Sequence, residues 1–173
     1  MESRAKLLGH PIHQMLIVFP LGLLATAVIF DIVYLITNNR TMTTVSYWMI
    51  VAGIIGAILA APFGLVDWLA IPDGTRAKSV GAMHGLGNVI VLLLFVGSWI
   101  MRRDTPYVDS YIPSTAALVL SFVGFALALI TGWLGGELVD RLRVGVDDDA
   151  NLDASSSLTR GSSGGHRQRE VTP

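Results

Sequence analysis

The chain has 173 residues, of which 52% are hydrophobic and only 14% charged, and its formal net charge is −1. Soluble domains usually carry about 25% charged residues, so the composition argues against a soluble fold. The near-zero net charge argues against a nucleic-acid partner. Cysteine is absent, which excludes disulfides, iron–sulfur ligation and thiol catalysis. Any metal or haem would have to be held by His, Asp, Glu or Met.

Four long apolar runs dominate the chain, each close to the roughly 20 residues that cross a bilayer as a helix. They cover residues 14–37, 46–71, 83–101 and 114–139. The short connections between them favour antiparallel neighbours. We therefore predict an all-α integral membrane protein, a four-helix up-down-up-down bundle at residues 14–146, preceded by a short cytoplasmic segment at residues 1–13.

Lys and Arg at the ends of the runs predict the orientation of the bundle, because cytoplasmic flanks carry an excess of them. One side carries six such residues: Arg4, Lys6, Arg76, Lys78, Arg141 and Arg143. The other side carries three: Arg40, Arg102 and Arg103. Both termini are thus expected in the cytoplasm, with the protein in the cell (inner) membrane. Residues 147–173 are rich in Asp, Ser and Gly and lack an apolar period, which predicts a disordered polar tail.

Five ionisable side chains stand at the cytoplasmic ends of the predicted helices, where the topology brings them to one level of the bilayer. They are His10, His13, Asp67, His84 and Glu137. Asn88 shares a face with His84, one helical turn away. Ionisable groups within a membrane are costly and often functional, although groups at helix ends can also simply reach water. These residues are the candidate site.

Prolines and spacings add local detail to this region. Pro11 suits the first helical position, which would leave His10 as the cap of the first helix. Pro20 and Pro62 lie in the cytoplasmic halves of their helices and should bend them. The separation of His13 from Asp67 nearly equals that of His84 from Glu137, so each predicted hairpin begins with a His and ends with an acid. This hints at a parallel internal repeat.

Asp31 stands apart from the candidate site, toward the outer end of the first predicted helix. We expect it to pair with Arg40 or to accept a hydrogen bond from Thr44 or Tyr47. Polar contacts of this kind help membrane helices to associate.

A set of residues spread over the predicted helices resembles the bacterial membrane family known as domain of unknown function 2231. The set begins with His10-Pro11-Ile12-His13, Phe19-Pro20 and Asp31, and it continues with Gly64, Asp67, His84, Asn88, Gly135-Gly136 and Leu138-Val139. The resemblance runs from about Gly9 to Val146. It implies a four-helix membrane protein of unassigned activity, and some relatives carry a Rieske-type domain, which implies a redox setting. Relatives commonly have a His-Gly after the fourth helix, where this chain has Arg141-Leu142-Arg143, so a ligand at Leu142 would be missing here.

Three functions are consistent with these features. The first is a b-type haem or redox-associated subunit, because two His side chains on different helices can ligate one haem iron. Its axial ligands would be His84 with His13 or His10, beside Asn88, and Arg76 or Lys78 would meet the propionates.

The second is a non-haem divalent metal site or an ion path built from His10, His13, Asp67, His84 and Glu137, whose mixed nitrogen and oxygen donors suit zinc, iron or manganese. The third is a non-catalytic accessory or assembly subunit. No catalytic residue is predicted, since hydrolase and phosphate-binding motifs are absent. The expected partners are the lipid bilayer and either a redox protein or further copies of the chain.

Overall fold

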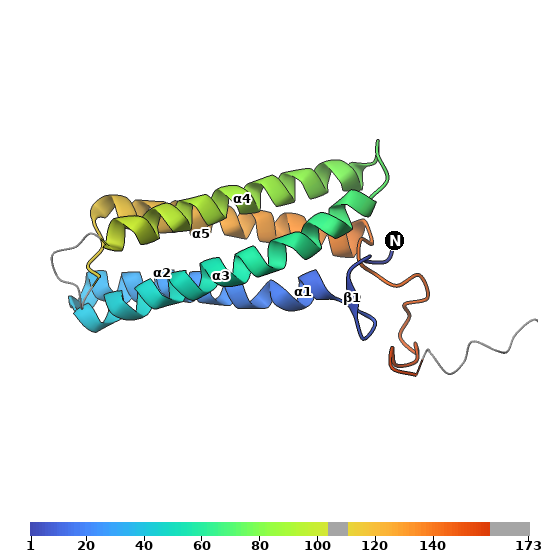
Figure 1. The fold of residues 1–173 in the computed structure, drawn as a ribbon, viewed down its shortest axis with the longest axis horizontal. Helices are drawn as coiled ribbons and strands as arrows, with labels where there is room; N and C mark the ends of the chain where they lie inside the picture. The colour runs from blue at the N-terminus through green and yellow to red at the C-terminus, as the bar shows by residue number, and fades with distance from the viewer. Residues whose placement is uncertain (104–110, 160–173) are drawn as a thin grey trace, which may run out of the picture.

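Four long antiparallel helices make up the protein in its computed structural model, which describes residues 1–103 and 111–159 (Figure 1). They are α2 (Val18–Thr37), α3 (Arg40–Ala70), α4 (Arg76–Arg103) and α5 (Thr115–Gly136). The short helix α1 (Ile12–Leu16) precedes α2, and a π-helical turn, η1 (Glu137–Arg141), follows α5. All four are long and apolar enough to cross a membrane. The predicted all-α membrane fold is confirmed.

The helices form two hairpins that lie side by side. In the first hairpin α2 packs along α3, and in the second α4 packs along α5; the hairpins meet chiefly through α3 and α4 and through α2 and α5 (Figure 1). The core between them is small and apolar, with Ile50 and Phe95 fully buried. Many large apolar side chains, such as Ile36 and Leu93, are instead exposed on the outside, as is required of helices that face lipid tails.

Two helices begin earlier than their apolar runs. Asn39 accepts a hydrogen bond from the backbone N–H of Thr41, so α3 begins at Arg40 and not at the predicted Ser46. Thr75 accepts from the N–H of Lys78 at 3.1 Å, so α4 begins at Arg76 and not at Met83. Such caps satisfy N–H groups that have no partner within the helix. His84, predicted to open a helix, therefore lies about two turns inside α4.

Proline shapes the start of the first hairpin. Pro11 is the N-cap residue of α1 and not its predicted first helical residue, which is Ile12. His10, predicted as the cap, lies in strand β2 (His10–Pro11). Ile17 separates α1 from α2, although it donates to the carbonyl of His13 and accepts from the N–H of Leu21. The α-helical hydrogen bond missing here is the one to the carbonyl of Leu16, because Pro20 has no N–H to donate. Pro62, in contrast, lies inside α3 without ending it.

Both ends of the described chain lie at one end of the bundle, here called the terminal end (Figure 1). There β1 (Lys6–Leu7) pairs with β2 in a two-residue hairpin, and Met1 donates to the carbonyl of Arg143 at 2.9 Å. Residues 147–159 form turns without helix or strand. The rest of the predicted disordered tail, residues 160–173, lies outside the described residues.

Candidate functional site

Of the five predicted site residues, the structure brings together His13 and His84. His13 is on α1 and His84 on α4, so each hairpin contributes one ring. The ring centroids are 6.4 Å apart and the planes stand at 85°. Both side chains are half-buried near the terminal end of the bundle. This histidine pair is the candidate site.

Each histidine is held by a backbone carbonyl of its own hairpin. His13 Nδ1 lies 3.0 Å from the carbonyl oxygen of Ala60, and His84 Nδ1 lies 2.8 Å from that of Thr131. Because a carbonyl oxygen only accepts, Nδ1 must carry the proton in each ring. Nε2 then carries the lone pair in a neutral imidazole.

Glycines give both rings room beside the helices. A Cβ at Gly64 would stand 2.7 Å from Cε1 of His13, and one at Gly135 would stand 3.2 Å from Cε1 of His84. The bare backbone of α3 and of α5 thus allows the close approach that both Nδ1 hydrogen bonds need. In the sequence, Gly64 and Gly135 were noted only among the residues that resemble the family, with no predicted contact to the histidines.

Asn88 is the one further predicted residue at the pair. Its amide nitrogen lies 3.2 Å from His84 Nε2, while its Oδ1 accepts from the Thr131 hydroxyl at 3.0 Å. The carbonyl oxygen of His84, 2.9 Å from the amide nitrogen of Asn88, fixes the orientation of the amide, because a carbonyl oxygen can only accept. Thr131 therefore supports His84 twice, through its carbonyl and through Asn88.

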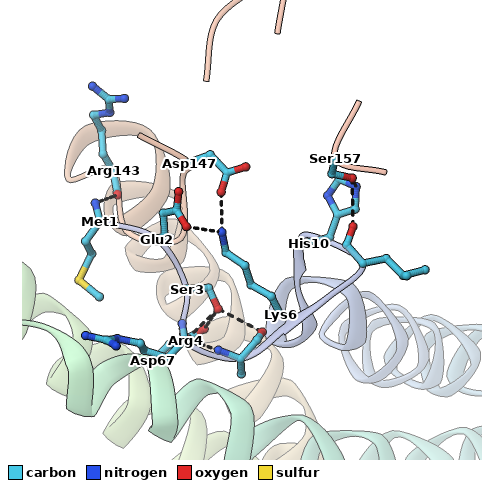
Figure 2. A network of polar contacts seen from close by, with 12 residues as sticks. Met1, Glu2, Ser3, Arg4, Lys6, His10, Asp67, Arg143, Asp147 and Ser157 are labelled. Atoms are coloured by element: carbon cyan, nitrogen blue, oxygen red, sulfur yellow. Dashed lines mark hydrogen bonds and ion pairs between the residues drawn. The ribbon is translucent and has the colours of Figure 1, made fainter. Parts of the chain in front are cut away.

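Asp67, predicted as a metal ligand, is instead occupied by the N-terminal segment (Figure 2). Its Oδ1 accepts from the backbone N–H of Arg4 at 2.7 Å and of Ala5 at 3.3 Å, and Ser3 Oγ lies 2.8 Å from both carboxylate oxygens. A carboxylate that satisfies two backbone donors and a hydroxyl is a strong acceptor site. Asp67 thus ties the first residues of the chain to the end of α3.

The other predicted donors also point elsewhere. Glu137 forms an ion pair with Arg76 at 2.8 Å. His10 Nε2 lies 3.4 Å from Ser157 Oγ (Figure 2). Among the described residues no group of three His, Asp or Glu side chains could hold a metal ion. The structure thus does not gather the five predicted residues around one point, because residues at the same level of a bundle can face different neighbours.

Lys78, predicted to meet a haem propionate, caps α3 instead. Its ammonium lies 3.1 Å from the carbonyl oxygens of Trp68 and Ile71 and 4.5 Å from the centroid of the Trp68 ring. A cation is stabilised at a helix C-terminus, where carbonyl groups lack helical partners. Arg76, the first residue of α4, is exposed and paired with Glu137.

Charged side chains fasten the N-terminal segment to the segment after η1 as well (Figure 2). The Lys6 ammonium lies 2.6 Å from carboxylate oxygens of Asp147 and of Glu2. These two hydrogen bonds raise the pKa of Lys6 above its ordinary value, and the bond from Lys6 lowers the pKa of Glu2. The segment is therefore held both by this ion cluster and by Asp67.

We expect Asp67→Ala to release the N-terminal segment from α3. Hydrogen bonds to a charged group contribute about 2 kcal/mol, so the amides of Arg4 and Ala5 should exchange with deuterium roughly thirtyfold faster. Asp67→Asn is the matched control: both amides donate to Oδ1, so its amide oxygen can keep both bonds without the charge and should give an intermediate rate. Unchanged exchange in Asp67→Ala, measured by mass spectrometry in detergent, would contradict the assignment.

A second polar cluster, which the sequence analysis did not foresee, lies toward the other end of the bundle. Arg102 and Asp31 form an ion pair through both guanidinium NH groups, and both side chains are fully buried. The predicted partners of Asp31 are therefore wrong, and so is the use of Arg102 as a charge flanking a helix. The available signal was that Asp31 and Arg102 are separated by the same 71 residues as His13 and His84.

Comparison with known proteins supports the membrane fold. A family model described as "Predicted membrane protein (DUF2231)" matches residues 9–148, which is most of the chain. No curated protein and no solved structure matches it.

Proposed function

Because the chain belongs to the predicted membrane protein family DUF2231, whose description assigns no activity, we propose a function from the geometry: His13 and His84 are the axial ligands of a b-type haem in a redox-associated membrane subunit. The observation that carries this proposal is the matched setting of the two rings. Each comes from a different hairpin, and each has Nδ1 committed to a backbone carbonyl.

That setting is the one that metal-binding histidines use. A ligating His commonly donates its other ring N–H to a carbonyl or carboxylate, which fixes the tautomer and makes the free nitrogen more basic. In both rings Nε2 is the nitrogen left for a metal. At His84 it faces the amide of Asn88, so Asn88 must turn aside for a metal to bind. Asn88 would then be free to donate to another group on the cofactor.

The number of ligands favours haem over a bare divalent cation. Zinc sites use three or four protein ligands, whereas the described residues offer two histidines and no third donor beside them. Haem brings four nitrogen ligands of its own and needs only axial ligands from the protein. When bound, it would supply a one-electron redox centre. The protein would orient both imidazoles and surround the iron with apolar helix.

The basic residues support a cytoplasmic location of this site. The terminal end carries Arg4, Lys6, Arg76, Lys78, Arg141 and Arg143. At the other end, Arg102 is neutralised inside the bundle by Asp31, which leaves Arg40 and Arg103. The asymmetry is thus larger than the sequence alone indicated, and it favours a terminal end in the cytoplasm. In a bacterium, the corresponding location is the inner membrane.

The test is an absorption spectrum of the full chain, purified in mild detergent after expression with added haem precursor. We expect a Soret band that shifts on reduction with dithionite, and about one haem per chain by pyridine haemochrome assay. Metals should be measured in the same sample. A colourless sample that contains stoichiometric zinc or manganese would show that the site binds a non-haem metal and not haem. A sample with neither haem nor metal would show that the histidine pair only stabilises the contact between the hairpins of an accessory subunit.

A further inference from the structure

The second hairpin repeats the first at an offset of 71 residues, the separation between Asp31 and Arg102. His13 bonds to the carbonyl of the residue 47 positions later, and so does His84. Adding the offset to His13 and Ala60 gives His84 and Thr131, so these two hydrogen bonds are equivalent. Gly64 and Gly135, which face the two rings, differ by the same offset.

The packing within each hairpin follows the same register. A Cβ at Gly53 would meet the Leu24 side chain at 2.6 Å, and a Cβ at Gly124 would meet Phe95 at 3.0 Å. Gly124 lies 71 residues after Gly53, and Phe95 lies 71 residues after Leu24. All four residues are buried. Asp67, in contrast, corresponds to Leu138 and not to Glu137. The repeat hinted at by the sequence thus exists in the packing, but the two acids are not part of it.

Equivalent residues that touch each other must lie close to the axis that relates the two halves. His13 contacts His84 near the terminal end, and Asp31 contacts Arg102 toward the other end. Two such contacts at different depths place an approximate twofold axis along the bundle, between the hairpins. This is the arrangement of a parallel repeat, whose axis runs along the membrane normal.

The surroundings of the ion pair are not symmetric, because hydroxyl groups surround Arg102 but not Asp31. Arg102 is surrounded by the hydroxyls of Ser98, Ser46 and Ser121, at 3.2, 3.4 and 3.3 Å from its nitrogens. All three serines are fully buried. At the equivalent positions around Asp31 the chain has residues that offer no hydroxyl: Ala27 for Ser98, Ala117 for Ser46, and Ile50 for Ser121. The cluster is therefore built for an arginine from the second hairpin.

We propose that the pairing surface of each hairpin recognises only the complementary hairpin, and that Asp31 and Ser46 on the first and Arg102 with Ser98 and Ser121 on the second determine this choice. Two first hairpins would bring two Asp31 carboxylates together on the axis, and two second hairpins would bring two Arg102 guanidinium groups together. Like charges in a buried site oppose association strongly. The partner of each surface is thus the other half of the same chain, and pairing between like hairpins of two copies is excluded.

The test exchanges the two sets across the axis in the full chain. Variant one carries Asp31→Arg, Arg102→Asp and the matching changes at the serine positions: Ala27→Ser, Ser98→Ala, Ile50→Ser, Ser121→Ile, Ser46→Ala and Ala117→Ser. The control is the single reversal Arg102→Asp, which puts two carboxylates on the axis. Size-exclusion chromatography in detergent and thermal unfolding followed by Trp fluorescence report on the membrane domain of each.

We expect the reversal alone to lose the monodisperse elution peak of the original chain and to lower the unfolding midpoint. The full exchange should restore that peak, with a midpoint nearer to the original chain than to the single reversal. A third variant, with the serines moved but Asp31 and Arg102 left in place, should unfold below the full exchange, because Arg102 then lacks its hydroxyls. The proposal is overturned if the full exchange is no more stable than Arg102→Asp. It is also overturned if the third variant is as stable as the full exchange.

Discussion

His13→Ala and His84→Ala should each abolish haem binding, and to the same extent. On the proposed assignment each imidazole would supply one of the two protein bonds to the iron, and the two rings occupy equivalent settings, each with Nδ1 on a carbonyl of its own hairpin. Neither substitution leaves a polar group without a partner, since the carbonyls of Ala60 and Thr131 lie within helices. The loss should therefore appear in the spectrum and not in the fold.

The measurement is haem per chain, together with the reduced-minus-oxidised spectrum, for each variant. His10→Ala is the matched control and should keep the full signal, because His10 lies beside Ser157 and not in the histidine pair. Imidazole added to His84→Ala should restore part of the Soret band by filling the vacated position. If His10→Ala loses the signal while His84→Ala keeps it, the ligand assignment is wrong.

Arg102→Met should lower the free energy of unfolding by about 3–5 kcal/mol, because removing one member of a buried ion pair leaves the other charge unpaired. Asp31 is fully buried and has Arg102 as its bonded guanidinium partner on both carboxylate oxygens. The polar environment of the serines would remain, but hydroxyls cannot replace a positive charge. This is the largest effect on stability that we expect from a single substitution.

The double variant Asp31→Leu with Arg102→Met is the informative comparison. Replacing both members of a buried pair by apolar residues of similar size is often neutral or stabilising, so most of the lost stability should return. Arg103→Met, at an exposed neighbouring position, should change the free energy by no more than about 0.5 kcal/mol. Equal stability of Arg102→Met and the original chain, measured by reversible unfolding in mixed micelles, would refute the role of the pair.

Together these variants separate the two contacts on the axis. Substitutions in the histidine pair near the terminal end are expected to change the haem absorption spectrum. Substitutions in the ion pair near the other end are expected to change the free energy of unfolding. Haem binding in Arg103→Met and stability in His10→Ala should both be unchanged. The two ends of the same interface thus have independent readouts, and a failure of one assignment leaves the other intact.

The sequence by itself determined the four spans and their antiparallel order, because span length and apolar content are properties of each segment alone. It did so less well at the helix starts. The caps at Asn39 and Thr75 extend α3 and α4 beyond their apolar runs, although capping residues of this kind are visible in the sequence. The prediction that His13 and His84 lie at the same end of the bundle is confirmed.

Only the tertiary structure decided which of those candidates meet. The position of a residue within its span fixes its level in the bundle but not the neighbour that it faces, so Asp67, Glu137 and His10 fell into the same predicted layer while each bonds elsewhere. The pairing of Asp31 with Arg102 depends on two hairpins packing in one register. That register arises from packing between the hairpins, such as that of Ile50 and Phe95 in one core, which exists only once the helices are assembled.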